Sequence, residues 1–142
     1  LMFDKTYEDR LRAWSEFRHD LDKSQNPIQD VIDCYSHAPT VSIHTDPWDS
    51  KSWPDPWELI QENQYCEFPR VLGMCYSLQL TDRFSGSSFE IHITTDYSKS
   101  TDYYILMVDK HVIGYYNSTY TSIDDLPTSL VDQKIYKMPY RQ

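Results

Sequence analysis

The spacing of hydrophobic residues changes near residue 85, and this change predicts a helical first half followed by strands. In residues 6–35 apolar side chains recur at steps of three and four, which places them on one face of a helix. From Phe89 onward they alternate with polar side chains, as in a half-buried strand. The pattern therefore predicts a single α+β domain.

Two amphipathic helices are predicted in the N-terminal part. The first is capped by Thr6 and extends to Leu21. Its apolar face carries Tyr7, Leu11, Trp14, Phe17 and Leu21. The second begins at Asn26-Pro27, because Asn is a good cap and Pro is tolerated at the first helical position, and it ends before Pro39. Residues 41–44 alternate apolar and polar, which indicates a short strand or an extended arm.

The rest of the chain is organised around the stretch from Trp53 to Leu80. Three prolines within residues 46–56 exclude a long helix there and predict a rigid loop. A short helix is expected from Pro56 to about Asn63. A second helix, from Glu67 to Leu80, has so little polar surface that it is predicted to be buried. Gly73 within it indicates a close approach by another backbone.

Residues 89–94, 103–108 and 112–116 predict an antiparallel meander with the buried helix across one face. Asp109-Lys110 is short enough for a hairpin turn. In the weakly patterned tail we expect a turn of helix between Leu126 and Leu130, and an edge strand at 135–138. The predicted fold has two N-terminal helices, a buried central helix and a three- to four-stranded antiparallel sheet. Its parts are a helical region (1–40), a Trp/Pro-rich loop (41–58), the central helix and meander (59–121) and a tail (122–142).

Charge and composition narrow the classes of function. With 22 acidic and 13 basic residues the net charge is −9, which argues against nucleic-acid binding because phosphate contacts require clustered Lys and Arg. No apolar run approaches 18 residues and no signal peptide is visible, so we expect no membrane span and no secretion by a visible signal. Because the chain begins with Leu1, a start further upstream stays open.

The cysteines and histidines provide one candidate for catalysis. Cys34, Cys66 and Cys75 include no CxxC pair, which favours a reducing compartment over a disulfide framework or zinc site. Cys66 precedes the buried helix, whose dipole can activate a thiol. His92 could serve as its base, with Asp109 or Asn117 to orient the ring. The default interpretation is a structural thiol. The acidic residues show no recognised ligand spacing, so we expect no metal and no cofactor.

A cysteine before a central helix, followed by three antiparallel strands, resembles the transglutaminase-like and papain-like core. The resemblance covers Pro54 to Asn117 and is topological. It implies a thiol-dependent acyltransferase or peptidase that uses Cys66. The chain departs from that family in having Tyr103-Tyr104 where the base would stand, and bulky neighbours around Cys66.

The segments TYEDRLRAWSEFR, DPWDSKSWPDPWELI and YCEFPRVLGMCYSLQLTDRF resemble small virion proteins of marine tailed phages. This resemblance implies a non-enzymatic connector, neck or decoration protein that binds other proteins or further copies of itself, located in a virion or in the cytoplasm of a host cell. The contact residues would be Trp14, Trp48, Trp53 and Trp57. For the tryptophans of the Pro-rich loop two interpretations remain open: they pin the loop to the body, or they form an exposed aromatic patch.

Overall fold

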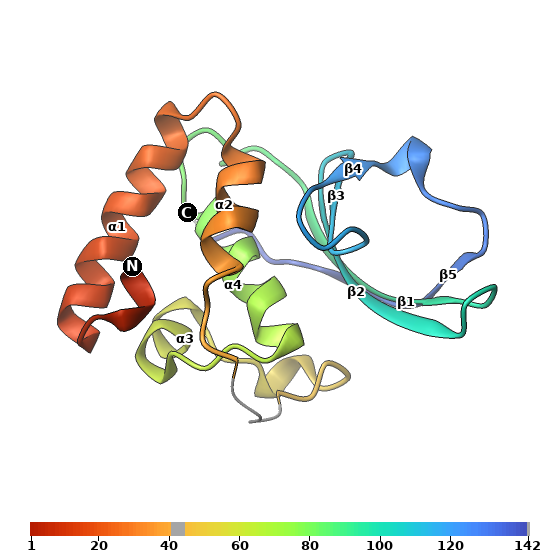
Figure 1. Ribbon diagram of the computed structural model, residues 1–142, viewed down its shortest axis with the longest axis horizontal. Coiled ribbons are helices and arrows are strands. Elements are labelled where there is room, and N and C mark those ends of the chain that lie inside the picture. Colours follow the sequence, from red (N-terminus) through yellow and green to blue (C-terminus); the bar gives the residue numbers. More distant parts are fainter. Residues whose placement is uncertain (41–44, 142) are drawn as a thin grey trace.

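The computed structural model describes residues 1–40 and 45–141, and it has an α+β fold with the helices gathered beside a curved sheet (Figure 1). The helices are α1 (Tyr7–Lys23), α2 (Pro27–Tyr35), α3 (Pro56–Glu62) and α4 (Glu67–Gln79), with 3-10 turns η1 (Met2–Asp4), η2 (Ser50–Ser52) and η3 (Ile123–Asp125). The strands are β1 (Phe89–Asp96), β2 (Thr101–Val108), β3 (His111–Ile113), β4 (Thr121–Ser122) and β5 (Leu130–Lys137). α4 lies between α2 and the sheet.

The predicted helices are confirmed, and their starts follow from local sequence. Thr6 and Asn26 occupy the N-cap positions of α1 and α2. α3 begins with a capping box, in which the Glu58 backbone N–H donates to the Asp55 carboxylate and the Asp55 N–H donates to the Glu58 side chain. Asn63 follows α3 as its C-cap and adopts the left-handed conformation with φ 52°.

α4 is the buried helix that its composition predicts. From Phe68 to Gln79 every residue is buried except Arg70. The close approach at Gly73 involves a side chain and not a backbone, which corrects the expectation: a Cβ on Gly73 would collide with the ring of Tyr35, on α2. Gly73 therefore gives α2 and α4 the space to pack against each other.

The sheet is antiparallel with five strands in the order β4-β3-β2-β1-β5, one more than the upper bound expected. The two faces of the sheet contribute side chains to different hydrophobic clusters. Side chains such as Ile91 and Leu106 join the main core with the helices. Ile105, Met107 and Val112 form a second, smaller cluster on the other face. The turn at Asp109-Lys110 is confirmed; Asp109 adopts φ 54°, and its carboxylate accepts a hydrogen bond from the Ser88 N–H.

The tail is more structured than its pattern suggested. The expected edge strand is present but longer, since β5 spans Leu130–Lys137 and pairs with β1. The expected turn of helix between Leu126 and Leu130 is wrong. The helical turn η3 ends at Asp125, because Pro127 favours extended geometry in Leu126, whose ψ is 142°. Leu126 and Leu130 instead pack against the second cluster.

The predicted strand or arm at residues 41–44 lies outside the described residues. Residues 46–56 form the expected loop, which contains η2 and leads directly into α3. No helix in the described part of the chain is long and apolar enough to cross a membrane.

Candidate functional site

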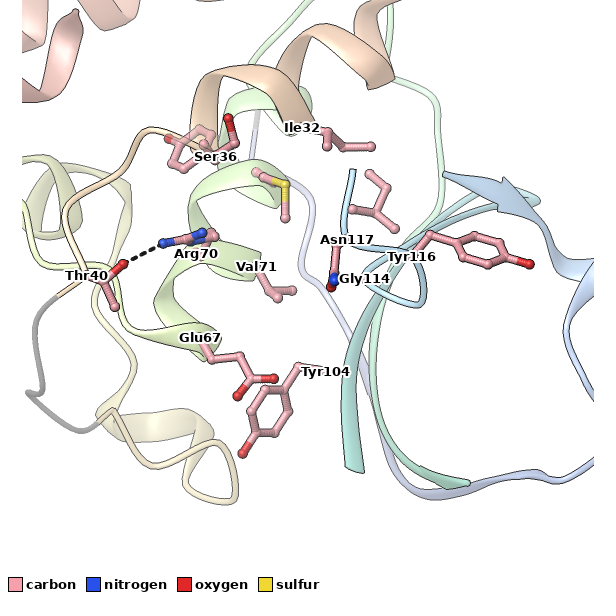
Figure 2. Close-up of a pocket in the computed structure, with 13 residues that line it drawn as sticks. Ile32, Ser36, Thr40, Glu67, Arg70, Val71, Tyr104, Gly114, Tyr116 and Asn117 are labelled. Atoms are coloured by element: carbon pink, nitrogen blue, oxygen red, sulfur yellow. Dashed lines mark hydrogen bonds between the residues drawn. The ribbon is translucent and has the colours of Figure 1, made fainter. Parts of the chain in front are cut away.

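A cleft of about 380 Å³ lies between the helical half of the molecule and the edge of the sheet (Figure 2). α2 and α4 form one wall, and β3 with the connection that follows it forms the other. Ile32, Val71, Met74 and Ile113 supply apolar surface. A volume of this size, with mostly apolar walls and a few polar groups, is typical of binding sites for small ligands and side chains.

One end of the cleft is polar and contains Arg70. The Nη2 group of Arg70 donates to the Thr40 hydroxyl at 2.9 Å and to the Ala38 carbonyl at 3.4 Å. Its Nε is buried and has no acceptor among the described residues. Glu67 also lines this end, but Figure 2 shows its side chain extending toward Tyr104 while Arg70 extends toward Thr40. Arg70 is thus a positioned cation at the cleft with hydrogen-bonding capacity left over.

Hydrogen bonds also tie the α2 region to residues 118–120, which follow the cleft-lining Asn117 in the chain. The Gln29 amide donates to the Ser118 carbonyl at 2.8 Å and accepts from the Thr119 hydroxyl at 3.1 Å. Asn26 does not cap α2 with its side chain, which accepts instead from the Tyr120 hydroxyl at 3.1 Å. These contacts fix the separation of the two walls.

The four tryptophans proposed as contact residues occupy different environments. Trp14 is 1% exposed, which corrects the expectation that it is available at the surface. Its indole N–H donates to the Ser77 hydroxyl at 2.9 Å, so burial leaves no polar group unsatisfied. Trp53 is half-buried and packs against Phe68 and Tyr136, with its N–H donating to the Asp46 carbonyl. Trp53 therefore pins the loop.

Trp48 and Trp57 are 57% and 48% exposed, so these two side chains do not pin the loop as Trp53 does. The Trp57 ring meets the Trp14 ring edge-on at 5.3 Å. The guanidinium of Arg18 lies 4.3 Å from the Trp14 ring centre and 5.8 Å from that of Trp57. We call Trp57, Arg18 and the adjoining exposed part of α1 the Trp57 surface.

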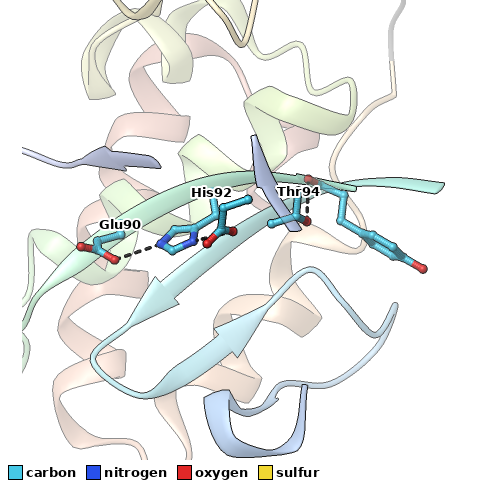
Figure 3. Close-up of polar contacts among 5 residues, drawn as sticks. Glu90, His92 and Thr94 are labelled. Carbon is cyan, nitrogen blue, oxygen red and sulfur yellow. Dashed lines mark hydrogen bonds and ion pairs between the residues drawn. The ribbon is translucent and has the colours of Figure 1, made fainter. Parts of the chain in front are cut away.

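The candidate catalytic residues are not assembled, and Figure 3 shows His92 engaged with Glu90 of its own strand. His92 faces away from the helices, since it pairs with Ile105 of the second cluster. Cys66 is the N-cap of α4. It lies near Tyr104, a residue that packs on the helical face of the sheet. The sheet therefore separates the two. Asp109 lies in the β2–β3 turn, bonded to the Ser88 N–H.

His92 instead joins two strands through carboxylates. Its Nε2 lies 2.9 Å from Glu90 Oε1 on the same strand, and its Nδ1 lies 3.0 Å from Asp132 Oδ1 on β5. Both ring nitrogens therefore face carboxylate oxygens, one on each side of the ring. Asn117, the other residue considered for orienting the ring, lines the cleft.

The remaining thiols are poor nucleophiles. Burial raises the pKa of Cys34 to about 12, and it raises the pKa of the fully buried Cys75 well above the usual range. Since the thiolate is the reactive form, both groups remain in the unreactive thiol form near neutral pH. In the described residues, no three His, Cys, Asp or Glu side chains gather closely enough to hold a metal ion.

A scan against protein-family models, a search of curated proteins and a search of solved structures each found no match. The site must therefore be judged from its own geometry. The cleft could not be predicted from the sequence, because its walls come from three distant segments with no shared local motif. Arg70 is a single cation among the buried residues of α4. This is the sequence signal that could have indicated one end of the cleft.

Proposed function

We propose that the protein is a non-enzymatic adaptor that binds another protein of a larger assembly through the Trp57 surface. The observation that carries this proposal is that Trp57 is 48% exposed although its ring rests on Trp14 and beside Arg18. Exposed tryptophan and arginine are enriched among the residues that contribute most of the free energy of protein binding.

The position of Trp57 is fixed before any partner binds. Pro56 occupies the first turn of α3, and the capping box at Asp55 and Glu58 holds that turn. Trp14, on which the ring packs, is itself held by Ser77 in the core. A side chain that is already ordered loses less conformational entropy when it is buried at an interface.

Charge indicates the kind of partner. Arg18 also lines a shallow depression between α1 and the connection after α4, whose other charged residues are mostly acidic: Glu16, Asp20, Asp22 and Asp82. Together with a net charge of −9, this favours a partner that presents Lys or Arg around an apolar contact. The arrangement agrees with interfaces in which a central aromatic contact is surrounded by polar groups.

The resemblance to small virion proteins leads us to propose a tailed-phage particle as the assembly, with this chain as a connector, neck or decoration component. The partner is then another virion protein or a further copy of this chain. No observation on the geometry of Cys66 favours the thiol-enzyme alternative.

Site-specific crosslinking tests the proposal. A photoreactive amino acid at Gln61, exposed on α3, should crosslink to one basic peptide of the partner in assembled particles or a co-expressed complex. The same group at Lys110, exposed in the β2–β3 turn, is the matched control and should not. Crosslinking at Gln61 should be lost in Trp57→Ala and retained in Trp48→Ala. If Trp57→Ala assembles and crosslinks like the wild type, the contact surface lies elsewhere.

A further inference from the structure

We propose that the cleft between α2, α4 and the β3–β4 connection binds a molecule that combines an apolar body with a terminal carboxylate. This site is separate from the Trp57 surface and does not depend on the adaptor function. The inference rests on three features: the apolar walls of the cleft, the absence of an ion pair at Arg70 among the described residues, and the position of Arg70 in the first turn of α4.

The walls define the apolar body of the ligand. Ile32 and Val71 extend toward the β3–β4 connection, with Asn117 opposite them, in Figure 2. Met74 and Ile113 complete this surface. The volume of about 380 Å³ is near the lower end of the range of about 300–1,000 Å³ that small-molecule pockets show. The hydrogen bonds of Gln29 to residues 118 and 119 hold α2 beside the β3–β4 connection.

Arg70 supplies the charge that selects the carboxylate. Among the described residues it has no ion pair, and its side-chain hydrogen bonds all come from Nη2. Those bonds orient the guanidinium, while its Nη1 makes no hydrogen bond in the described part of the chain and is not among the enclosed polar atoms. The planar guanidinium pairs best with a carboxylate or phosphate. Arg70 is the single cation among the described lining residues, which matches a monoanionic carboxylate better than a phosphate dianion.

The location of Arg70 strengthens the argument. Its backbone N–H donates to the Cys66 carbonyl and so closes the first turn of α4. The N-terminal end of a helix carries partial positive charge, where a cation is disfavoured and an anion is stabilised. Glu67 occupies the same turn but extends away from Arg70 toward Tyr104 (Figure 2). An anion from outside the chain would therefore be stabilised by both the guanidinium and the helix.

Two probes of equal size test the carboxylate: 3-phenylpropanoate and its neutral analogue 3-phenylpropanamide. Binding is followed by NMR of the Met74, Val71, Ile32 and Ile113 methyl groups. The carboxylate should shift these signals and bind at least about tenfold more tightly than the amide, as a charge-assisted hydrogen bond implies. Equal affinity of the two probes, or shifts confined to other methyl groups, overturns the proposal.

Two variants locate the site. Arg70→Gln should lower the affinity for 3-phenylpropanoate to that of the amide, while Arg12→Gln, at an exposed arginine of α1, should change nothing. Ser36→Trp places a large ring at the exposed rim of the cleft without touching Arg70, and it should abolish binding of both probes. Unchanged binding in either Arg70→Gln or Ser36→Trp overturns the site.

The carboxylate has two sources, a free small acid or the C-terminus of a polypeptide. The peptide acetyl-Gly-Gly-Phe, with a free carboxylate, distinguishes them. Tighter binding of the peptide than of 3-phenylpropanoate supports the site with a chain terminus as its ligand, and weaker binding supports it with a small acid. Trp57→Ala should leave all these affinities unchanged, so failure here is distinguishable from failure of the proposed adaptor function.

Discussion

Two polar clusters hold different halves of the molecule, and they differ in composition and in exposure to solvent. In the helical half, Trp14, Tyr35 and Ser77 form a neutral network that joins α1, α2 and α4. In the sheet, the imidazole of His92 and the carboxylates of Glu90 and Asp132 form a second network that joins only β1 and β5. The helical network is fully enclosed, whereas the carboxylates of the other are 28% and 43% exposed.

The enclosed network satisfies each of its polar groups. The Ser77 hydroxyl donates to the Gly73 carbonyl at 2.8 Å, so its oxygen is left to accept from the Trp14 N–H and the Tyr35 hydroxyl. In the sheet network, solvent reaches both acids, so their contacts with His92 contribute little to stability. We infer that stability depends mainly on the helical core, while the outer strand β5 is the region most easily loosened.

The largest effect should come from exchanging Trp14. Trp14→Ala removes a fully buried ring and should lower the free energy of unfolding by about 3–5 kcal/mol. Trp57→Ala, the matched change in the ring that contacts it, should cost about 1 kcal/mol or less because Trp57 is half-exposed. Urea unfolding of both variants provides the measurement, and equal losses would contradict the contrast between core and surface.

A smaller effect is expected for Ser77→Ala. The change leaves the Trp14 N–H and the Tyr35 hydroxyl buried without their acceptor, which should cost about 1–3 kcal/mol. Ser36→Ala, at an exposed serine beyond the end of α2, is the control and should stay within about 0.5 kcal/mol of the wild type. Thermal unfolding followed by circular dichroism compares them; a neutral Ser77→Ala would show that the network does not stabilise the core.

The smallest global effect should follow Asp132→Asn. Because Asp132 is partly exposed, its contact with His92 should contribute about 1 kcal/mol or less to overall stability. The loss should be local: amide hydrogen exchange in β5 should become faster while that in α4 stays unchanged. Asp124→Asn, an exposed acid in η3, is the control. Slower exchange in β5, or equal changes in α4, would contradict the separation of the two networks.

The sequence predicted best those elements whose residues contact a single core. The apolar face of α1 included Trp14, so periodicity alone pointed to the burial that the structure shows. α4 was recognised from its uniform apolar content. The full length of β5 was not, because most of its residues are exposed at the edge of the sheet and carry little apolar alternation. The separation of Cys66 from His92 was also hidden, since chain order does not reveal which face of a sheet a residue occupies.

The cleft has a consequence for how the protein is produced. Asn117 lines it and begins the sequence Asn117-Ser118-Thr119, which is an acceptor for N-linked carbohydrate in secreted proteins. A sugar chain attached there would project into the cleft mouth and disturb the bonds from Gln29 to Ser118 and Thr119. Material from a eukaryotic secretory host would then carry an obstructed cleft, whereas bacterial expression would leave it open.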